Sequence, residues 1–319
     1  GGWQIHSLES VIRRNHPELR DEEKSCNYKT RNTLKIYMEY LIEQIRKQVG
    51  KEKSTLNLFI DMRDIEASER EKNLSFFDSF YREELKKQGL GGQAYSANIN
   101  SLELVDGELY FENVVIHGVI ILALDVEITP AIFRAFIMDK IYFPDHVGLR
   151  MLGDKRNLAI LRELAQSGKL SPRDSELMLR HIPWTSPVKN KATIFKGAEY
   201  NLPQLLKKNK SRFVIKASRG YQGKDVFIGK FTDDKEWEEI LETALKTGAF
   251  IAQEFSDSVE FTAPNQQNEW TPHKLIWGAF GFGDFYGGVW VRMSEVKTDV
   301  GVINSATGAV EAIVFEILS

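Results

Sequence analysis

Apolar and polar positions recur along the first part of the chain in a way that predicts successive helices and strands. In residues 29–50 the apolar side chains return every three or four positions, which predicts an amphipathic helix. Residues 56–61 form a short apolar run that ends on an acidic residue and predicts a strand. A charge-rich helix is expected at 69–88, where glycines end it. This order predicts an open α/β sheet for residues 55–145.

Three further elements are expected within that sheet region. Residues 93–97 predict a second strand, and Asp106-Gly107 between two apolar stretches predicts a hairpin turn. Residues 114–124 predict a third, long strand. The apolar run to which they belong is too short to span a bilayer and is interrupted by His117, so we expect it to be buried inside the protein.

The second half of the chain changes from helices to glycine-rich strands. Helices are expected at 154–166 and after Ser171-Pro172, because serine is a favourable N-cap and proline fits the first turn. Residues 185–200 are interpreted as a linker. From Phe213 onward the sequence predicts strands separated by glycines, and a domain boundary is expected close before them.

These patterns predict an α/β protein whose C-terminal part is α+β. A chain of 319 residues exceeds what one hydrophobic core usually supports. We expect an open α/β domain with leading helices at 1–150, a helical linker segment at 151–195 and a strand-rich domain at 196–319.

Composition and charge narrow the classes of function. Hydrophobic residues make up 42% and charged residues 27%, as in ordinary soluble proteins. The net charge of −3 gives no electrostatic reason to expect nucleic acid, and neither a membrane span nor a signal segment is expected. The single cysteine, Cys26, excludes a disulfide within the chain and fits a reducing, cytoplasmic location.

The strongest chemical signal is the segment Phe213–Gly229. A β-branched strand leads into Lys216, a loop with Gly220 and Gly223 follows, and a second strand returns. Glycine allows backbone N–H groups to approach phosphate oxygens closely, and the lysine adds a positive charge. The spacing fits neither a Walker loop nor a dinucleotide-binding turn. An ordinary β-hairpin with a glycine turn explains the same residues equally well.

Two other strands carry polar groups at positions where strands are usually apolar. The run 248–255 ends in Gln253-Glu254, which suits the edge of an adenine pocket but also an ordinary strand. Arg292 lies inside a predicted strand, where a charge is costly unless it meets an anion. That anion can be a ligand, or it can be a carboxylate of the chain such as Glu295 or Glu316.

Charged residues also cluster at the start of the helix expected at 154–166. Asp154 is a plausible N-cap. Lys155 and Arg156 follow it at the positive end of the helix dipole, which is unfavourable for cations unless an anion binds there.

Eight short motifs occur in an order that resembles the circularly permuted ATP-grasp family, relatives of eukaryotic glutathione synthetase and glutathionylspermidine synthase. The resemblance covers residues 90–319. Its motifs are Asp106 to Tyr110, Gly153 to Arg156, Ile182 to Thr185, Lys216 to Gly223, Glu236-Trp237, Gln253-Glu254, Gly288 to Arg292 and Asn304-Ser305.

The resemblance implies an ATP-grasp nucleotide-binding domain at 196–319, preceded by a pre-ATP-grasp or substrate domain within 1–150. It implies that the glycine loop closes over the phosphates as a lid and that Arg292 stabilises charge on the transferred phosphoryl group or the acyl phosphate. The implied ATP-binding residues are Lys155, Lys216, Ser218, Gly220, Tyr221, Gln222, Gly223, Gln253, Glu254 and Phe255.

The same resemblance implies magnesium as a second cofactor, with Asn304 as a ligand of the metal or of phosphate. The family supplies further magnesium ligands through a Glu-x-Asn element before the matched region, and none stands before Trp3. We expect this element to lie upstream of Gly1 or to be lost.

The function implied is an ATP-dependent ligase that joins a carboxylate to an amine through an acyl phosphate. Such a transfer needs positioning and charge neutralisation more than a protein nucleophile. Two alternatives stay open: an inactive nucleotide-binding module, and an unrelated α/β interaction protein whose glycine hairpin is structural. The sequence does not identify the carboxylate or the amine, which are expected to be small molecules or peptides.

Overall fold

The computed structural model describes residues 2–18, 28–122, 127–220, 223–265, 267–298, 303 and 308–317. It shows a mixed α/β protein, as the sequence predicts at this level. The chain forms two compact units, and we describe each by itself. The first unit contains residues 1–150, 278–290 and 313–319, and the second contains residues 151–277 and 291–312. In the described part of the chain, no helix has both the length and the apolar character needed to span a membrane.

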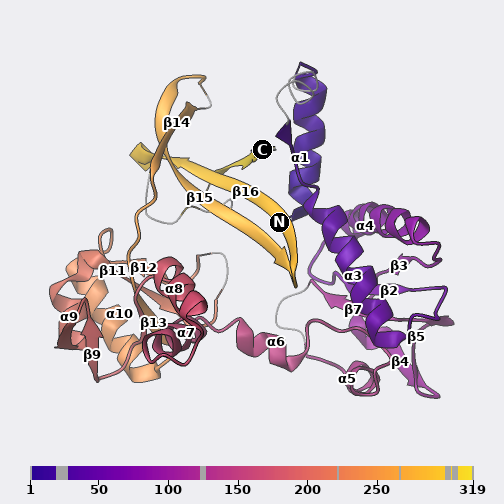
Figure 1. The fold of residues 1–319 in the computed structure, drawn as a ribbon, viewed down its shortest axis with the longest axis horizontal. Helices are drawn as coiled ribbons and strands as arrows, with labels where there is room; N and C mark the ends of the chain where they lie inside the picture. The colour runs from indigo at the N-terminus through magenta and orange to yellow at the C-terminus, as the bar shows by residue number, and fades with distance from the viewer. Residues whose placement is uncertain are drawn as a thin grey trace. The chain divides into compact units, whose positions relative to one another are not determined.

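The elements of the first unit appear in Figure 1. They are α1 (Gly2–Asn15), β1 (Tyr28–Lys29), α3 (Thr33–Val49), β2 (Leu58–Asp61), α4 (Ala67–Lys87), β3 (Ala94–Tyr95), β4 (Leu102–Val105), β5 (Glu108–Phe111), β6 (Val114–Val115), β7 (Gly118–Ile121), α5 (Pro130–Ile137) and β18 (Glu316–Ile317). Helix α6 (Val147–Leu152) contains the division between the two units, which falls after Arg150. Helices α3 and α4 confirm the two helices predicted at 29–50 and 69–88.

A parallel sheet in the order β3-β2-β7 is the centre of the first unit. Its strands alternate between two cores because successive side chains point to opposite faces. Leu58, Ile60 and Ile120 pack with α3 and α4 on one face. Phe59 and Val119 pack on the other face, against α5 and the antiparallel β4-β5-β6 sheet. The predicted hairpin at Asp106-Gly107 joins β4 to β5, and both residues have positive φ.

The long strand predicted at 114–124 is wrong, because the described part of this segment divides into β6 and β7 in different sheets. Strand β6 pairs with β5, and β7 pairs with β2. His117 lies between them, where its Nδ1 accepts a hydrogen bond from the Asn57 amide at 3.0 Å. Gly118 at the start of β7 lies close against α3, since a Cβ atom there would lie 2.7 Å from the end of the Ile45 side chain. Residues 123–126 lie outside the described part.

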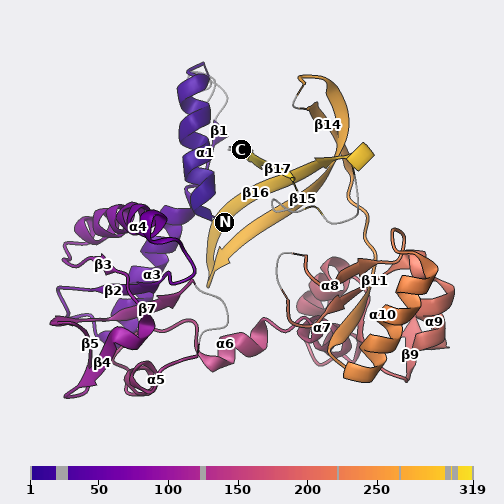
Figure 2. The same ribbon diagram turned by 180° about the vertical axis from the view of Figure 1, so that it is seen from behind.

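The second unit contains a four-stranded antiparallel sheet in the order β12-β11-β13-β8. Figure 2 shows its strand β11 together with the helices α9 and α10 of this unit. Its elements are α7 (Arg156–Gln166), α8 (Pro172–His181), β8 (Thr185–Pro187), β9 (Ala192–Phe195), β10 (Ala198–Asn201), α9 (Leu202–Lys208), β11 (Phe213–Ala217), β12 (Val226–Ile228), α10 (Asp234–Thr247), β13 (Phe250–Glu254) and β14 (Glu260–Pro264). Ser171 caps α8 as predicted, since its side chain accepts a hydrogen bond from the Asp174 amide.

The interpretation of residues 185–200 as a linker is wrong. Thr185–Pro187 form β8, which pairs with β13 at the edge of the sheet, and β9 and β10 form a hairpin. Val188 and Phe195 are buried in the same core as Trp237 of α10. The polar residues between Val188 and Phe195 suggested a linker. The burial of these two apolar side chains instead fixes the segment in the second unit.

Two long strands contribute to both units. Strands β15 (Trp270–Phe282) and β16 (Phe285–Glu295) are neighbours in a sheet of the order β14-β15-β16-β17, where β17 is Val310–Ile313. Residues 278–290, which include the turn between them, belong to the first unit. There the hydroxyl of Thr33 donates to the carbonyl of Gly287 at 2.7 Å, which joins α3 to the start of β16.

Candidate functional site

A row of three hydrogen-bonded polar side chains crosses the antiparallel sheet of the second unit. The Nζ of Lys216 on β11 donates to Oε1 of Gln253 on β13 at 2.6 Å. The Nε2 of Gln253 donates in turn to Oγ1 of Thr185 on β8 at 2.8 Å. These side chains share a face because Lys216 lies opposite Ile251, two positions from Gln253, while Gln253 lies opposite Thr185.

The other face of the same strands is apolar and buried. Phe213, Ile215 and Ala252 point to that face and pack with Trp237 and Leu241 of α10. The alternation along β11 therefore places Lys216 on the face away from α10, in a strand whose other residues are fixed by the core.

Lys155 brings the start of α7 to the end of β11. Its backbone amide donates to the carbonyl of Ser218 at 2.8 Å. Its Nζ donates to the carbonyls of Ala217 at 3.2 Å and Gly220 at 2.9 Å. Lys155, Lys216, Gln253, Thr185 and Gly220 thus form one site, which we call the cationic corner.

The two ammonium groups of the cationic corner have neutral hydrogen-bond partners. Within the described residues, neither Lys155 nor Lys216 pairs with a carboxylate. Burial lowers the pKa of Lys216 below its usual value, and the nearby charge of Lys155 lowers it further. Each ammonium group has more N–H donors than these bonds use, so the corner has both the charge and the donors to bind an anion.

Asp154 is adjacent to the cationic corner and is engaged by two arginines. Its carboxylate lies 2.5 Å from Arg156 and 3.3 Å from Arg219, and it also accepts a hydrogen bond from the Arg156 amide. The hydrogen bond from the Arg156 side chain is the main cause that lowers the pKa of Asp154 to about 2. Asp154 is not the N-cap predicted from the sequence, because Lys155 occupies that position and its side chain makes no capping hydrogen bond. The carboxylate instead accepts hydrogen bonds from the amide and the side chain of Arg156, and so supplies an anion beside that arginine.

The loop after β11 is closed at its base. The Ala217 amide donates to the carbonyl of Asp225 at 3.0 Å, and Gly223 has a φ of +79° that suits glycine. Ser218 is buried, its amide donates to the carbonyl of Ala249, and its carbonyl accepts from Lys155. The predicted lid residues Tyr221 and Gln222 lie outside the described residues.

The three residues predicted to border adenine diverge at the end of β13. Gln253 lies in the polar row, whereas the Glu254 side chain pairs with Lys196 at 2.8 Å and with Arg212 at 3.7 Å. The amide of Glu254 donates to the carbonyl of Trp184, and the amide of Phe255 donates to the carbonyl of Arg212. Both amides are thus occupied by the chain itself, and Gln253 alone of the three joins Lys216.

Arg292 lies on β16 in the second unit and is partly buried. Of the two carboxylates considered as its partners, Glu295 pairs with Lys297 at 2.7 Å and Glu316 pairs with Arg31 at 2.8 Å. Arg292 itself has an interaction partner within the chain. Asn304 lies outside the described residues. Among those that are described, no group of three or more histidine, cysteine, aspartate or glutamate side chains could hold a metal ion.

No role was predicted for Thr185 from the sequence. It closes the polar row from the edge strand, and its own hydroxyl donates to the carbonyl of Pro183 at 2.8 Å. The only signal in the sequence for a role of Thr185 is its place at the end of the Ile182 to Thr185 motif. Its contact with Gln253 could not be predicted, because the two residues are distant in sequence.

Comparison with known proteins gives a distant structural likeness. No protein-family model matches the chain, and no curated protein matches it. Among solved structures, the chain is similar to a glutathione synthetase-like effector from Globodera pallida in its apo form, with 11% identical residues and a TM-score of 0.48. The match covers 91% of this chain and 60% of the effector chain. A likeness this distant assigns neither an activity nor a site residue to this protein.

Proposed function

We propose that the cationic corner binds the phosphates of ATP and that the protein is an ATP-dependent carboxylate–amine ligase of the ATP-grasp type. The observation that carries the proposal is the convergence of Lys155 and Lys216, both with neutral partners, where β11 meets a glycine loop. Two buried or half-buried cations that repel each other need an anion between them, and a polyphosphate supplies several charged oxygens.

The chain's own residues have distinct roles in this proposal. Lys216 is held by Gln253 and Thr185, which fix its ammonium group against the sheet. Lys155 is bonded to the carbonyl of Gly220, so a phosphate that it contacts lies at the base of the loop. The glycine loop covers the phosphates, and Arg292 stabilises the negative charge on the transferred phosphoryl group.

The proposed reaction has two steps. A substrate carboxylate oxygen attacks the γ-phosphorus of ATP, the bond to the β-phosphate oxygen breaks, and an acyl phosphate and ADP form. The amine then attacks the acyl carbon, loses a proton and displaces inorganic phosphate, which leaves an amide. The positive side chains lower the barrier because negative charge shifts between the phosphates as the phosphoryl group moves.

Magnesium is the remaining cofactor of the proposal, and the described residues do not by themselves fit it. Asp154, the carboxylate beside the cationic corner, is held by Arg156 and Arg219. No metal-binding cluster of acidic residues occurs in the described ranges. We therefore assign no step to the metal, and Asn304 stays a prediction for its ligand.

Calorimetric titration of the full chain with ATP in magnesium buffer tests the binding step. We expect Lys216→Met to weaken ATP binding about 10- to 100-fold, since a charge-assisted hydrogen bond contributes about 1.5–3 kcal/mol. Lys207→Met is the matched control, because Lys207 is exposed and pairs with Glu238 on the surface. Equal affinities in the native protein and the Lys216 variant would overturn the assignment of the site.

Turnover distinguishes the ligase from a nucleotide-binding module without catalysis. The assay measures phosphate release from ATP with pairs of candidate carboxylates and amines, and mass spectrometry identifies the amide. Binding of ATP without release under any pair favours the inactive module, for which the engagement of Asp154 by arginines is the supporting observation. Absence of ATP binding favours a structural role for the glycine hairpin.

A further inference from the structure

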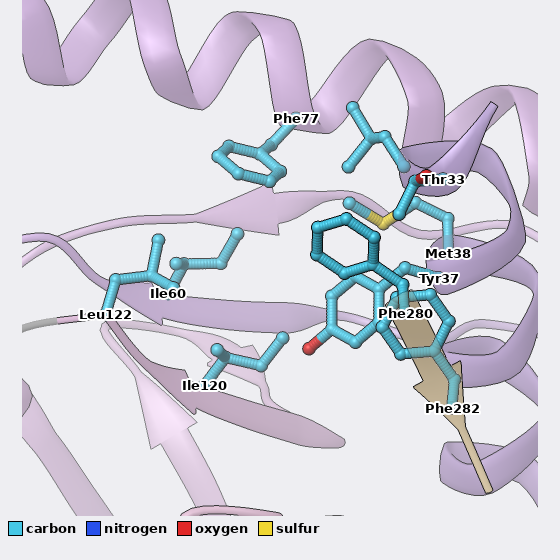
Figure 3. A pocket seen from close by; sticks show the side chains of 10 residues that line it. Thr33, Tyr37, Met38, Ile60, Phe77, Ile120, Leu122, Phe280 and Phe282 are labelled. Atoms are coloured by element: carbon cyan, nitrogen blue, oxygen red, sulfur yellow. The ribbon is translucent and has the colours of Figure 1, made fainter. Parts of the chain in front are cut away.

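A pocket of about 260 Å³ lies inside the first unit and takes no part in the proposed function. Its wall comes from α3, β2, α4, β7 and the end of β15 that belongs to this unit. Figure 3 shows Ile60, Phe77 and Ile120 around it, with Phe280 beside Tyr37. Nearly all of the surface that lines this apolar pocket comes from hydrocarbon side chains.

The apolar pocket lies where open α/β sheets usually bind ligands. Strand β2 is the first of the three parallel strands in the chain, and β3 and β7 pair on its two sides. Strand β2 is followed by α4, which packs on one face of the sheet, and β7 is followed by α5, which packs on the other, so a topological switch point lies between β2 and β7. Ile60 and Ile120 are paired across these strands near their carboxyl ends, and Leu122 follows β7 directly.

The pocket is partly open and leaves hydrocarbon surface in contact with water, which a bound apolar group would cover. An enclosed apolar cavity of about 150 Å³ can hold a benzene molecule, so this pocket has room for an aromatic ring or a branched aliphatic chain. It is also accessible, since Leu122 at its edge is 38% exposed and the side chains of Phe280 and Phe282 are only partly buried. A ligand can enter without unfolding the core.

The pocket offers one available polar atom. The hydroxyl of Thr33 already donates to the carbonyl of Gly287 at 2.7 Å. The hydroxyl of Tyr37 points into the pocket (Figure 3). Burial raises the pKa of Tyr37 above its usual value, so the hydroxyl stays protonated and can donate a hydrogen bond.

We propose that the apolar pocket binds the aromatic or branched aliphatic group of a small organic molecule, with one polar atom of that molecule bonded to the Tyr37 hydroxyl. The inference is independent of the proposed nucleotide site, because every residue that lines the pocket belongs to the first unit.

Titration calorimetry on the full chain without nucleotide tests this proposal. The probes are indole and 4-methylpentanoate, and imidazole serves as a polar ring without comparable apolar area. We expect indole and 4-methylpentanoate to bind with millimolar or lower dissociation constants, and imidazole to bind at least tenfold more weakly.

Two variants fill the space from different sides. Ile120→Phe places a larger side chain inside the pocket, and Leu122→Trp blocks its accessible edge; each is expected to weaken indole binding at least tenfold. Ile137→Trp is the matched control, because Ile137 is 62% exposed in the same unit but does not line the pocket. Thermal unfolding establishes that each variant folds. If Ile120→Phe does not fold, Leu122→Trp alone provides the test.

The outcomes separate this proposal from the nucleotide site. Indole binding that Lys216→Met leaves within twofold supports an independent pocket. Equal indole binding by the native protein and Leu122→Trp would overturn the proposal. So would a native protein that binds neither indole nor 4-methylpentanoate, whatever its affinity for ATP.

Discussion

The cationic corner and the apolar pocket differ in what each leaves unsatisfied: charge in the first and apolar surface in the second. In the cationic corner, Lys155 and Lys216 hold positive charge among neutral groups, and burial acts against that charge. In the apolar pocket, hydrocarbon side chains leave space unfilled around one hydroxyl. Each arrangement is unfavourable without a ligand, but for a different reason, so the two sites should respond to different changes of solvent and sequence.

We therefore expect salt and pH to change ligand binding at the cationic corner, and the shape of the ligand to decide binding in the apolar pocket. Electrostatic attraction to a phosphate weakens with ionic strength, whereas burial of apolar area does not. The two units also respond to acid differently, because each contains a buried titratable group of a different kind.

The largest effect is expected from acid on the first unit. His117 is buried, and its Nδ1 accepts a hydrogen bond from the Asn57 amide, which requires the neutral ring. Burial lowers the pKa of His117 to about 4. A lowered pKa means that the stability it supports is complete above about 6.5 and is lost as pH falls toward 4, by about 3 kcal/mol in all. Amide exchange of β2 and β7 at pH 7, 5 and 4 measures this loss.

His117→Asn removes the titrating ring but keeps a polar side chain between the two sheets. The variant should start less stable at pH 7 and lose less stability on acidification. The interpretation fails if the native protein and the variant show the same dependence of β2 and β7 exchange on pH.

The next largest effect concerns the buried charge of Lys216. Because its pKa is lowered in the folded protein, the unfolded chain binds more protons between that pKa and about 10.5, and stability rises with pH in this range. Lys216→Met should abolish that rise in the free energy of unfolding and leave the apo protein at least as stable near pH 7. ATP binding should fall about 10- to 100-fold in the same variant. Urea unfolding at pH 7 to 10, with Lys207→Met alongside, provides the comparison.

A smaller effect is expected at Asp154. Its pKa of about 2 indicates stability that is present above about 3.8 and is lost as pH falls through 2. Arg156 is 42% exposed at its side chain, so solvent screens the pair and we expect Asp154→Asn to cost only about 1 kcal/mol. The exchange rate of the α7 amides measures the change. A variant that loses as much stability at pH 2 as at pH 7 would contradict this account.

Local signals in the sequence predicted much of the fold. Helix α3 follows from side-chain periodicity, and α4 follows from a charge-rich segment that glycines end. The hairpin at Asp106-Gly107 follows from two residues that tolerate positive φ. The strand predicted at 114–124 failed because its division depends on pairing with two sheets whose other strands are distant in sequence. The same cause hid β8, whose partner β13 lies beyond β11 and α10.

In the candidate sites, too, residues marked by local sequence features were predicted, and residues brought together by distant contacts were not. Lys216 was found from its place before a glycine loop, and Lys155 from its place at a helix start, since both are local features. Thr185 was not found from the sequence, because its contact with Gln253 depends on strand register. The apolar pocket was not found either, because Phe280 reaches it from a strand far along the chain from α3. Hydrophobic periodicity describes such residues only as core.

The smallest effect is expected from a change at a single atom, the hydroxyl oxygen of Tyr37. Tyr37→Phe removes the one available polar atom of the apolar pocket and leaves its shape almost unchanged. Phenol should bind the variant about threefold more weakly than the native protein, because one neutral hydrogen bond contributes about 1 kcal/mol or less. Toluene, which has no hydrogen-bonding group, should bind both proteins equally. Competition of each compound with indole, followed by ligand-detected NMR, measures the ratio. If phenol and toluene respond alike, the pocket selects its ligand by apolar shape alone, and the Tyr37 hydroxyl has no part in recognition.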